Sequence, residues 1–130
     1  MLSWTDNLAL GNAEIDADHR AAVGLMNRLA GADDAAVPAL FDGLVQHMRD
    51  HFARESAVMT ACAFPPQACH EDEHTRVLGL LDDIAAEVAA GRVEVARKFG
   101  AEAGPAWFID HRNTMDFVTV TYARNAAAAG

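Results

Sequence analysis

Apolar residues along this chain recur every three or four positions, which is the period of an amphipathic α-helix. Val23, Met26 and Leu29 form such a stripe in the first third of the chain. Leu81 and Ile84 continue another in the third quarter. Such stripes predict helices along most of the chain.

Glycine and proline residues mark where the helices are expected to end. Gly31 and Gly91 each follow an apolar stripe, and Pro38 suits the first turn of a helix. The consecutive prolines of "AFPPQ" must interrupt helical hydrogen bonding. The expected helices cover about residues 16–30, 37–62, 67–90 and 105–125.

The fourth helix has the least clear start. The segment "RVEVARKF" looks helical, but Gly100 and the Gly104–Pro105 step interrupt it, so we expect the last helix to begin near Pro105. Residues 1–15 are expected to form an irregular arm, and the final "NAAAAG" a frayed tail. The fold class is therefore all-α: a single domain over residues 1–130, folded as an up-down-up-down antiparallel four-helix bundle.

The composition limits the kinds of molecule that this chain is expected to bind. The formal net charge of −9 argues against binding to nucleic acid or to an anionic membrane surface. The start "MLSWTDNLAL" has neither a basic region nor a long apolar one, and no apolar run is long enough for membrane insertion. We therefore expect a cytoplasmic protein whose Cys62 and Cys69 stay reduced and act as small apolar residues.

Histidine is the compositional oddity, with six residues against one tyrosine. In "QHMRDHFARES", His47, His51 and Glu55 are each four residues apart and leave one face of a helix. His70 and His74 have the same spacing in "HEDEH". A single histidine of this kind is as often a surface residue, but the joint pattern indicates a metal site.

The remaining candidate ligands come from the other helices. His19 lies early in the first, and His111 and Asp116 lie in the fourth. Five residues correspond to about 140° of rotation, so these two do not stack in a regular helix, but they could still converge if Asp116 reaches across the end of a site that His111 faces. The whole set exceeds what one tetrahedral zinc requires and suits two six-coordinate ions, with iron favoured by imidazole and carboxylate ligands. The candidate ligands are His19, His51, Glu55, His70, His74, His111 and Asp116.

The ordered series His19, H-F-x-x-E, H-x-x-x-H and H-x-x-x-x-D resembles the hemerythrin family in its short bacterial form. The resemblance also includes the segment "LALGNAEIDADH", and it runs from Trp4 to about Asp116. Trp107, four residues before His111, completes it.

This resemblance implies a centre with two iron ions that binds dioxygen reversibly. His70, His74 and His111 would hold one iron, whereas His19 and His51 would hold the other and leave it five-coordinate, with one open position. Glu55, Asp116 and a solvent-derived oxygen would bridge the pair. The implied role is oxygen storage, delivery (oxygen transport) or sensing rather than enzymatic turnover, with dioxygen as ligand and an unidentified protein as recipient.

Four residues are expected to line the ligand pocket: Phe52, Trp107, Ala22 and Arg112. Phe52 and Trp107 would form an apolar wall that excludes water. Ala22 is small for a wall, and Arg112 stands where the family commonly has an aliphatic residue, although its side chain could also extend outward. These two residues keep open the alternatives of a di-iron enzyme acting on peroxide or nitric oxide, or a metal- or redox-sensing module. His47 is not part of the expected ligand set.

Overall fold

The computed structural model describes residues 2–129, which contain helices and no strand. Three rods are single α-helices, and the fourth joins α-helical and π-helical segments end to end. The first three rods are α1 (Ala13–Ala30), α2 (Val37–Ala61) and α3 (Gln67–Ala89). The fourth consists of α4 (Glu94–Lys98), η3 (Phe99–Ala103), α5 (Gly104–His111), η4 (Arg112–Asp116) and α6 (Phe117–Ala129). The predicted all-α class is confirmed.

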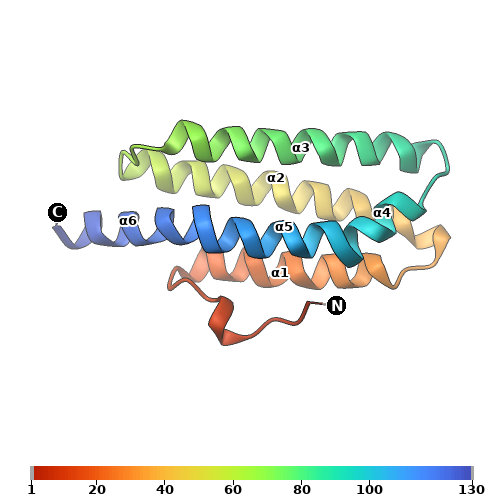
Figure 1. Ribbon diagram of the computed structural model, residues 1–130, viewed down its shortest axis with the longest axis horizontal. Coiled ribbons are helices and arrows are strands. Elements are labelled where there is room, and N and C mark those ends of the chain that lie inside the picture. Colours follow the sequence, from red (N-terminus) through yellow and green to blue (C-terminus); the bar gives the residue numbers. More distant parts are fainter. Residues whose placement is uncertain (1, 130) are drawn as a thin grey trace.

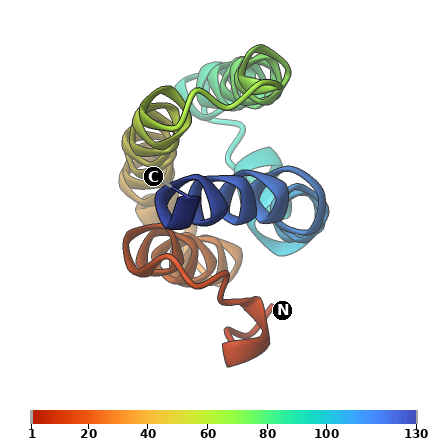
Figure 2. The ribbon, with the colours of Figure 1, turned by 90° about the vertical axis from the view of Figure 1, so that its left-hand side faces the viewer.

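Consecutive rods run in opposite directions along the bundle (Figure 1). α1 packs on α2, α2 on α3, and the fourth rod packs against α1. Seen along the bundle, the rods occupy four corners around a common interior (Figure 2). This is the predicted up-down-up-down arrangement, and it makes one buried space that every rod can reach.

Local signals explain the helix ends. The Asn12 side chain accepts a hydrogen bond from the backbone N–H of Ile15, so α1 begins three residues earlier than expected. At the end of α2, Ala63 adopts a φ of 52°, and the N–H of Phe64 donates back to the carbonyl of Met59. Gly91, with a φ of 87°, follows the end of α3, as predicted.

Apolar side chains from all the rods fill the interior. Leu29, Val37, Phe41, Leu44 and Leu81 are at most 1% exposed, so the predicted stripes do face inward. Within residues 2–129, no helix combines the length and apolar character needed to cross a lipid bilayer.

The N-terminal arm, which contains the 3₁₀ turn η1 (Asp6–Leu8), is tied to the bundle by side chains of α1 and η4. The Asn27 amide donates to the backbone carbonyl of Leu2 at 2.6 Å. The Arg112 guanidinium donates to the carbonyls of Asn7 and Leu8, both at 3.0 Å. The arm is irregular, as expected, but it is held on the surface of the bundle by these bonds.

The expectation for the fourth rod was wrong at both ends. The rod begins at Glu94 rather than near Pro105, and it continues as helix to Ala129 rather than fraying after residue 125. The π-helical segment η3 carries the chain through Gly100 to Pro105, which lies in the first turn of α5. A π turn has wider spacing between hydrogen-bonded residues, so the missing N–H of proline falls where the hydrogen bonding already changes register.

Gly100 is also where the fourth rod comes closest to α1. A Cβ atom at this position would lie 2.7 Å from the backbone oxygen of Met26 and 3.1 Å from the backbone nitrogen of Ala30. Both neighbours are backbone atoms, which cannot rotate away. The absence of a side chain at Gly100 therefore sets the distance between these two rods.

Replacing Gly100 with alanine should lower the free energy of unfolding by about 1–3 kcal/mol, because the rods must move apart. Gly79→Ala is the matched control: a Cβ there meets no atom within 4 Å, so this helical substitution should raise stability by about 0.5–1 kcal/mol. Urea unfolding of both variants measures the difference. Equal stability of Gly100→Ala and the parent chain would contradict the proposed close approach.

Candidate metal centre

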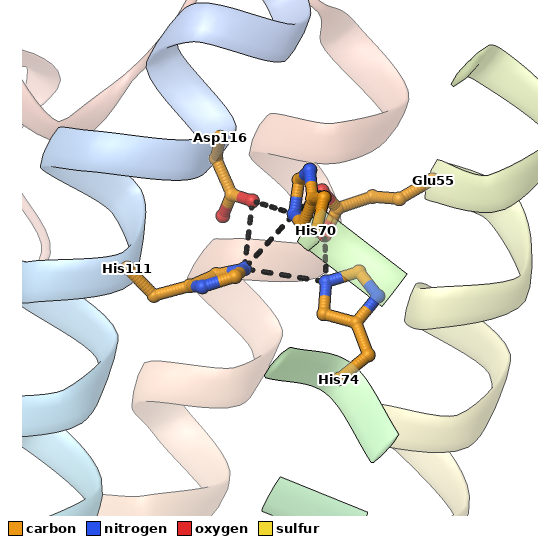
Figure 3. A group of neighbouring side chains, drawn as sticks. All are labelled: Glu55, His70, His74, His111 and Asp116. Carbon is orange, nitrogen blue, oxygen red and sulfur yellow. Dashed lines mark hydrogen bonds and ion pairs between the residues drawn. The ribbon is translucent and has the colours of Figure 1, made fainter. Parts of the chain in front are cut away.

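Seven buried side chains converge in the interior at the level of α5 and η4. They form two groups in which each residue offers one potential ligand atom, and these atoms lie within 4.8 Å of one another. The first group contains Glu55, His70, His74, His111 and Asp116, drawn in Figure 3. The second contains His19, His51, Glu55 and Asp116. The structure thus brings together every predicted ligand, and the two carboxylates belong to both groups.

Asp116 faces both groups at once. One of its oxygens, Oδ2, lies 3.0 Å from Nε2 of His19. The other, Oδ1, lies 3.1 Å from Nε2 of His70 and 3.0 Å from Nε2 of His111. Each oxygen therefore serves a different set of imidazoles, which is the arrangement of a carboxylate that bridges two ions.

Glu55, on α2, also faces imidazoles of both groups. Its Oε1 lies 2.5 Å from Nε2 of His51, and its Oε2 lies 3.5 Å from Nε2 of His70. The side chain is fully buried, and neither oxygen accepts a properly aligned hydrogen bond from the described residues. A buried carboxylate without such partners is costly unless a cation is present.

The imidazoles also face one another in a way that protein hydrogen bonds alone do not satisfy. Nε2 of His111 lies 3.1 Å from Nε2 of His70 and 3.2 Å from Nε2 of His74 (Figure 3). A neutral imidazole has one donor and one acceptor nitrogen, so three converging Nε2 atoms cannot all be paired. Divalent cations would accept all these lone pairs, and the residues present fit a metal centre.

A π turn explains why His111 and Asp116 share this site although five residues separate them. The segment η4 (Arg112–Asp116) is π-helical, and its extra residue per turn returns Asp116 to the face that His111 occupies. Thr114 donates to the carbonyl of Asp110 at 2.7 Å within this turn. The sequence-based expectation assumed a regular α-helix, in which these two residues do not stack; the π turn is the feature that lets them converge on one site.

Burial sets the protonation of the metal-free centre. It lowers the pKa of His74 to about 3, with the charges of His70 and His111 acting in the same direction. Burial, assisted by the charge of Asp116, raises the pKa of Glu55 well above its ordinary value. Burial also opposes ionisation of Asp116, but hydrogen bonds from neighbouring imidazoles outweigh it and hold that pKa well below its ordinary value. Neutral His74 keeps a lone pair for a metal ion.

Two groups behind the imidazoles were not predicted from the sequence. Nδ1 of His51 lies 2.9 Å from the carboxylate of Asp18, and Nδ1 of His70 lies 2.8 Å from the hydroxyl of Thr119. Thr119 follows Asp116 by three residues, so helical spacing alone could have indicated it. Asp18 pairs across helices, and no spacing along one helix predicts such a contact.

Aromatic rings cover the imidazoles on one side. Phe52 stacks on His74 with ring centres 3.8 Å apart, and Trp107 stacks on His111 at 4.6 Å. Phe108 meets the ring of His19 edge-on at 5.1 Å. Both predicted aromatic residues thus contact candidate ligands.

An apolar cavity of about 20 Å³ lies beside two of these aromatic rings, Trp107 and Phe108. Trp107 and Phe108, which contact His111 and His19, form part of its wall, and the predicted Ala22 lies there too. Its lining consists of Ala22, Met26, Leu44, Met48, Val77, Leu81, Phe99, Gly104, Trp107 and Phe108. A cavity of this size holds about one water-sized molecule, and an apolar lining keeps such a space dry.

Two other residues lie outside the site. The guanidinium of Arg112 binds the N-terminal arm and is not part of the cavity lining, so its placement in the ligand pocket is corrected to the outward alternative. His47 belongs to neither ligand group; its Nε2 lies 2.9 Å from the backbone oxygen of Asp18.

The fold and the site together define the class of protein: a four-helix bundle with a buried, histidine-rich metal centre. Comparison with known families gives the same result. The model of the hemerythrin HHE cation-binding domain matches residues 10–123. The chain is also 36% identical to a bacteriohemerythrin of Ralstonia nicotianae, over 99% of this chain and 98% of the relative. A bacteriohemerythrin of Stenotrophomonas maltophilia is 33% identical over 57% of this chain and 51% of its own length. The chain belongs to the hemerythrin family.

The ligand set remains a prediction that metal analysis can test. His74→Ala should reduce the iron content of the purified protein to about half or less, because it removes an imidazole from one ion and exposes the centre to water. The matched control is His47→Ala, which lies on the neighbouring helix and outside both groups, and which should keep the full iron content. Parental iron content in His74→Ala would remove this residue from the ligand set.

Proposed function

We propose that this chain binds two iron ions in the centre and binds dioxygen reversibly at one of them. The observation that carries this proposal is the pair of buried ligand groups that share Glu55 and Asp116 beside an apolar cavity. Family membership supports iron as the metal, and the histidine-rich ligand set agrees with it.

The uneven division of imidazoles suggests where dioxygen binds. His70, His74 and His111 gather in one group, whereas only His19 and His51 belong to the other. If Glu55, Asp116 and one solvent-derived oxygen were shared, the iron held by His19 and His51 would have one ligand fewer and could keep an open position. The iron pair would supply the electrons and the binding site for dioxygen, and the protein supplies the surroundings.

The surroundings favour a carrier over an enzyme. The cavity lining contains no acidic or basic side chain that could deliver a proton to bound dioxygen. The indole N–H of Trp107 is engaged, since it donates to Glu73 at 3.0 Å. Two observations weaken the case for turnover: Arg112 points to the N-terminal arm, and Ala22 borders a cavity with room for only a very small molecule.

Storage, delivery and sensing all require the same reversible binding step, so the proposal covers each of them. The protein recipient of oxygen and the cytoplasmic location stay predictions from the sequence. The second candidate, an enzyme acting on peroxide or nitric oxide, would need a wider cavity or a proton donor at the site.

The proposal predicts a reversible colour change. Iron-loaded protein prepared without oxygen should develop a visible charge-transfer band when air is admitted, and the band should vanish when the oxygen is removed under vacuum. Visible spectroscopy through several cycles measures this. Irreversible conversion in the first cycle would contradict reversible binding and favour the alternatives, enzymatic turnover or a redox-sensing module.

A second experiment tests the cavity as the route to the iron. Ala22→Val should fill much of the free space and slow oxygen binding several-fold in stopped-flow measurements, with an overpacking cost of about 1–3 kcal/mol in stability. Ala21→Val is the matched control, because it adds the same side chain at an exposed position one residue earlier. Identical binding rates in the two variants would show that dioxygen enters by another path.

A further inference from the structure

Asp18 lies behind His51, on the opposite side of the imidazole ring from the metal-facing nitrogen. Its Oδ2 is 2.9 Å from Nδ1 of His51, whereas Nε2 of the same ring faces Glu55. Because a carboxylate only accepts hydrogen bonds when ionised, this contact requires a proton on Nδ1 and leaves the lone pair on Nε2. The contact thus fixes the tautomer that metal binding needs.

Arg54 holds this carboxylate in place. Its Nε donates to Oδ2 and its Nη2 donates to Oδ1 of Asp18, each at 2.7 Å. This two-bond geometry is the most directional form of ion pair. The side chain of Asp18 is only 11% exposed, whereas that of Arg54 is 36% exposed, so the pair lies at the boundary between the centre and solvent.

The imidazole of His51 differs in this respect from the other candidate ligands whose Nδ1 contacts are described. Nδ1 of His70 bonds to the uncharged hydroxyl of Thr119. Nδ1 of His19 and Nδ1 of His74 have no hydrogen-bond partner among the described residues. The charged partner thus belongs to His51, which lies in the group that we assign to the oxygen-binding iron.

We propose that Asp18 and Arg54 form a positioning pair for the centre, in which Asp18 fixes the orientation and tautomer of His51 and Arg54 holds Asp18. The pair also connects α1, where His19 follows Asp18 directly, to α2, where Arg54 precedes Glu55. The ligands of the smaller group are therefore held in register before any metal is bound. The part of this inference that concerns iron rests on the proposed function.

The pair also affects the electronic character of the site. A carboxylate behind a metal-binding imidazole makes the ring a stronger electron donor to the metal. The two hydrogen bonds from Arg54 draw part of that negative charge away. Loss of Arg54 should thus make His51 a stronger donor and favour the oxidised iron, whereas loss of Asp18 should have the opposite effect on donation and loosen the ring.

The test compares Asp18→Ala with Asp82→Ala. Asp82 forms an ion pair with Arg49 at 2.8 Å between α2 and α3, so the control also breaks a contact between rods but lies at an exposed position. The first readout is ¹⁵N NMR of the imidazoles in metal-free protein at neutral pH. We expect His51 to be protonated at Nδ1 in the parent and in Asp82→Ala, and to become a tautomer mixture in Asp18→Ala.

The second readout is Fe²⁺ affinity measured by anaerobic titration. Asp18→Ala should bind Fe²⁺ about 10–100-fold more weakly, and Asp82→Ala should match the parent. If Asp18→Ala fails to fold, Arg54→Ala takes its place, since this substitution removes only a partly exposed side chain. Arg54→Ala protein should keep the Nδ1 proton on His51, but its iron should oxidise faster in air. Arg54→Lys should restore part of the parental oxidation rate.

An unchanged tautomer and unchanged Fe²⁺ affinity in Asp18→Ala would reduce the pair to an ordinary ion pair and overturn the inference. Oxidation of Arg54→Ala at the parental rate would overturn it as well. Failure of the proposed function is a different result: parent protein that takes up no iron pair would refute that function, while the tautomer measured in metal-free protein would still decide the role of Asp18.

Discussion

The structure depends on one constraint: two carboxylates and five imidazoles are buried together in an apolar interior. Water is too far away to solvate them, so each must be paired within the protein or with a cation. Asp116 finds imidazole partners, but the two oxygens of Glu55 accept no hydrogen bond from the described residues. Metal ions would supply what is missing, and the bundle brings the candidate ligands close enough together to hold them.

Irregularities in the fourth rod follow from the same constraint. A regular α-helix would turn Asp116 away from His111, and the π segment η4 corrects this rotation. The other π segment, η3, lies before α5, and its Gly100 allows the rod to approach α1 closely. π segments in α-helices are often found at functional sites because they aim side chains that a regular helix would misplace. Here the irregular turns place a ligand and bring two rods together.

The sequence predicted the parts of the fold that depend on residues within one helix. Periodic apolar stripes indicated the first three rods, and i, i+4 spacing brought out pairs such as His70 and His74. The prediction failed at the start of the fourth rod because Gly100 and Pro105 normally break an α-helix, and their accommodation depends on the π turn and on packing against α1. The contacts of Arg112 with the arm, and of Asp18 with His51, join distant parts of the chain. Spacing along a single helix carries no information about such contacts.

The centre is asymmetric in its surroundings as well as in its ligands. The group with fewer imidazoles has a charged pair behind His51, and Phe108, which lines the cavity, forms a T-shaped contact with the ring of His19. The group with more imidazoles has a hydroxyl behind His70, with Phe52 and Trp107 stacked on its other rings. The apolar cavity adjoins both groups, because its wall includes Phe108, which contacts His19, and Trp107, which contacts His111. The two candidate groups therefore differ in the polarity and packing of the side chains around them, and not only in the number of their imidazoles.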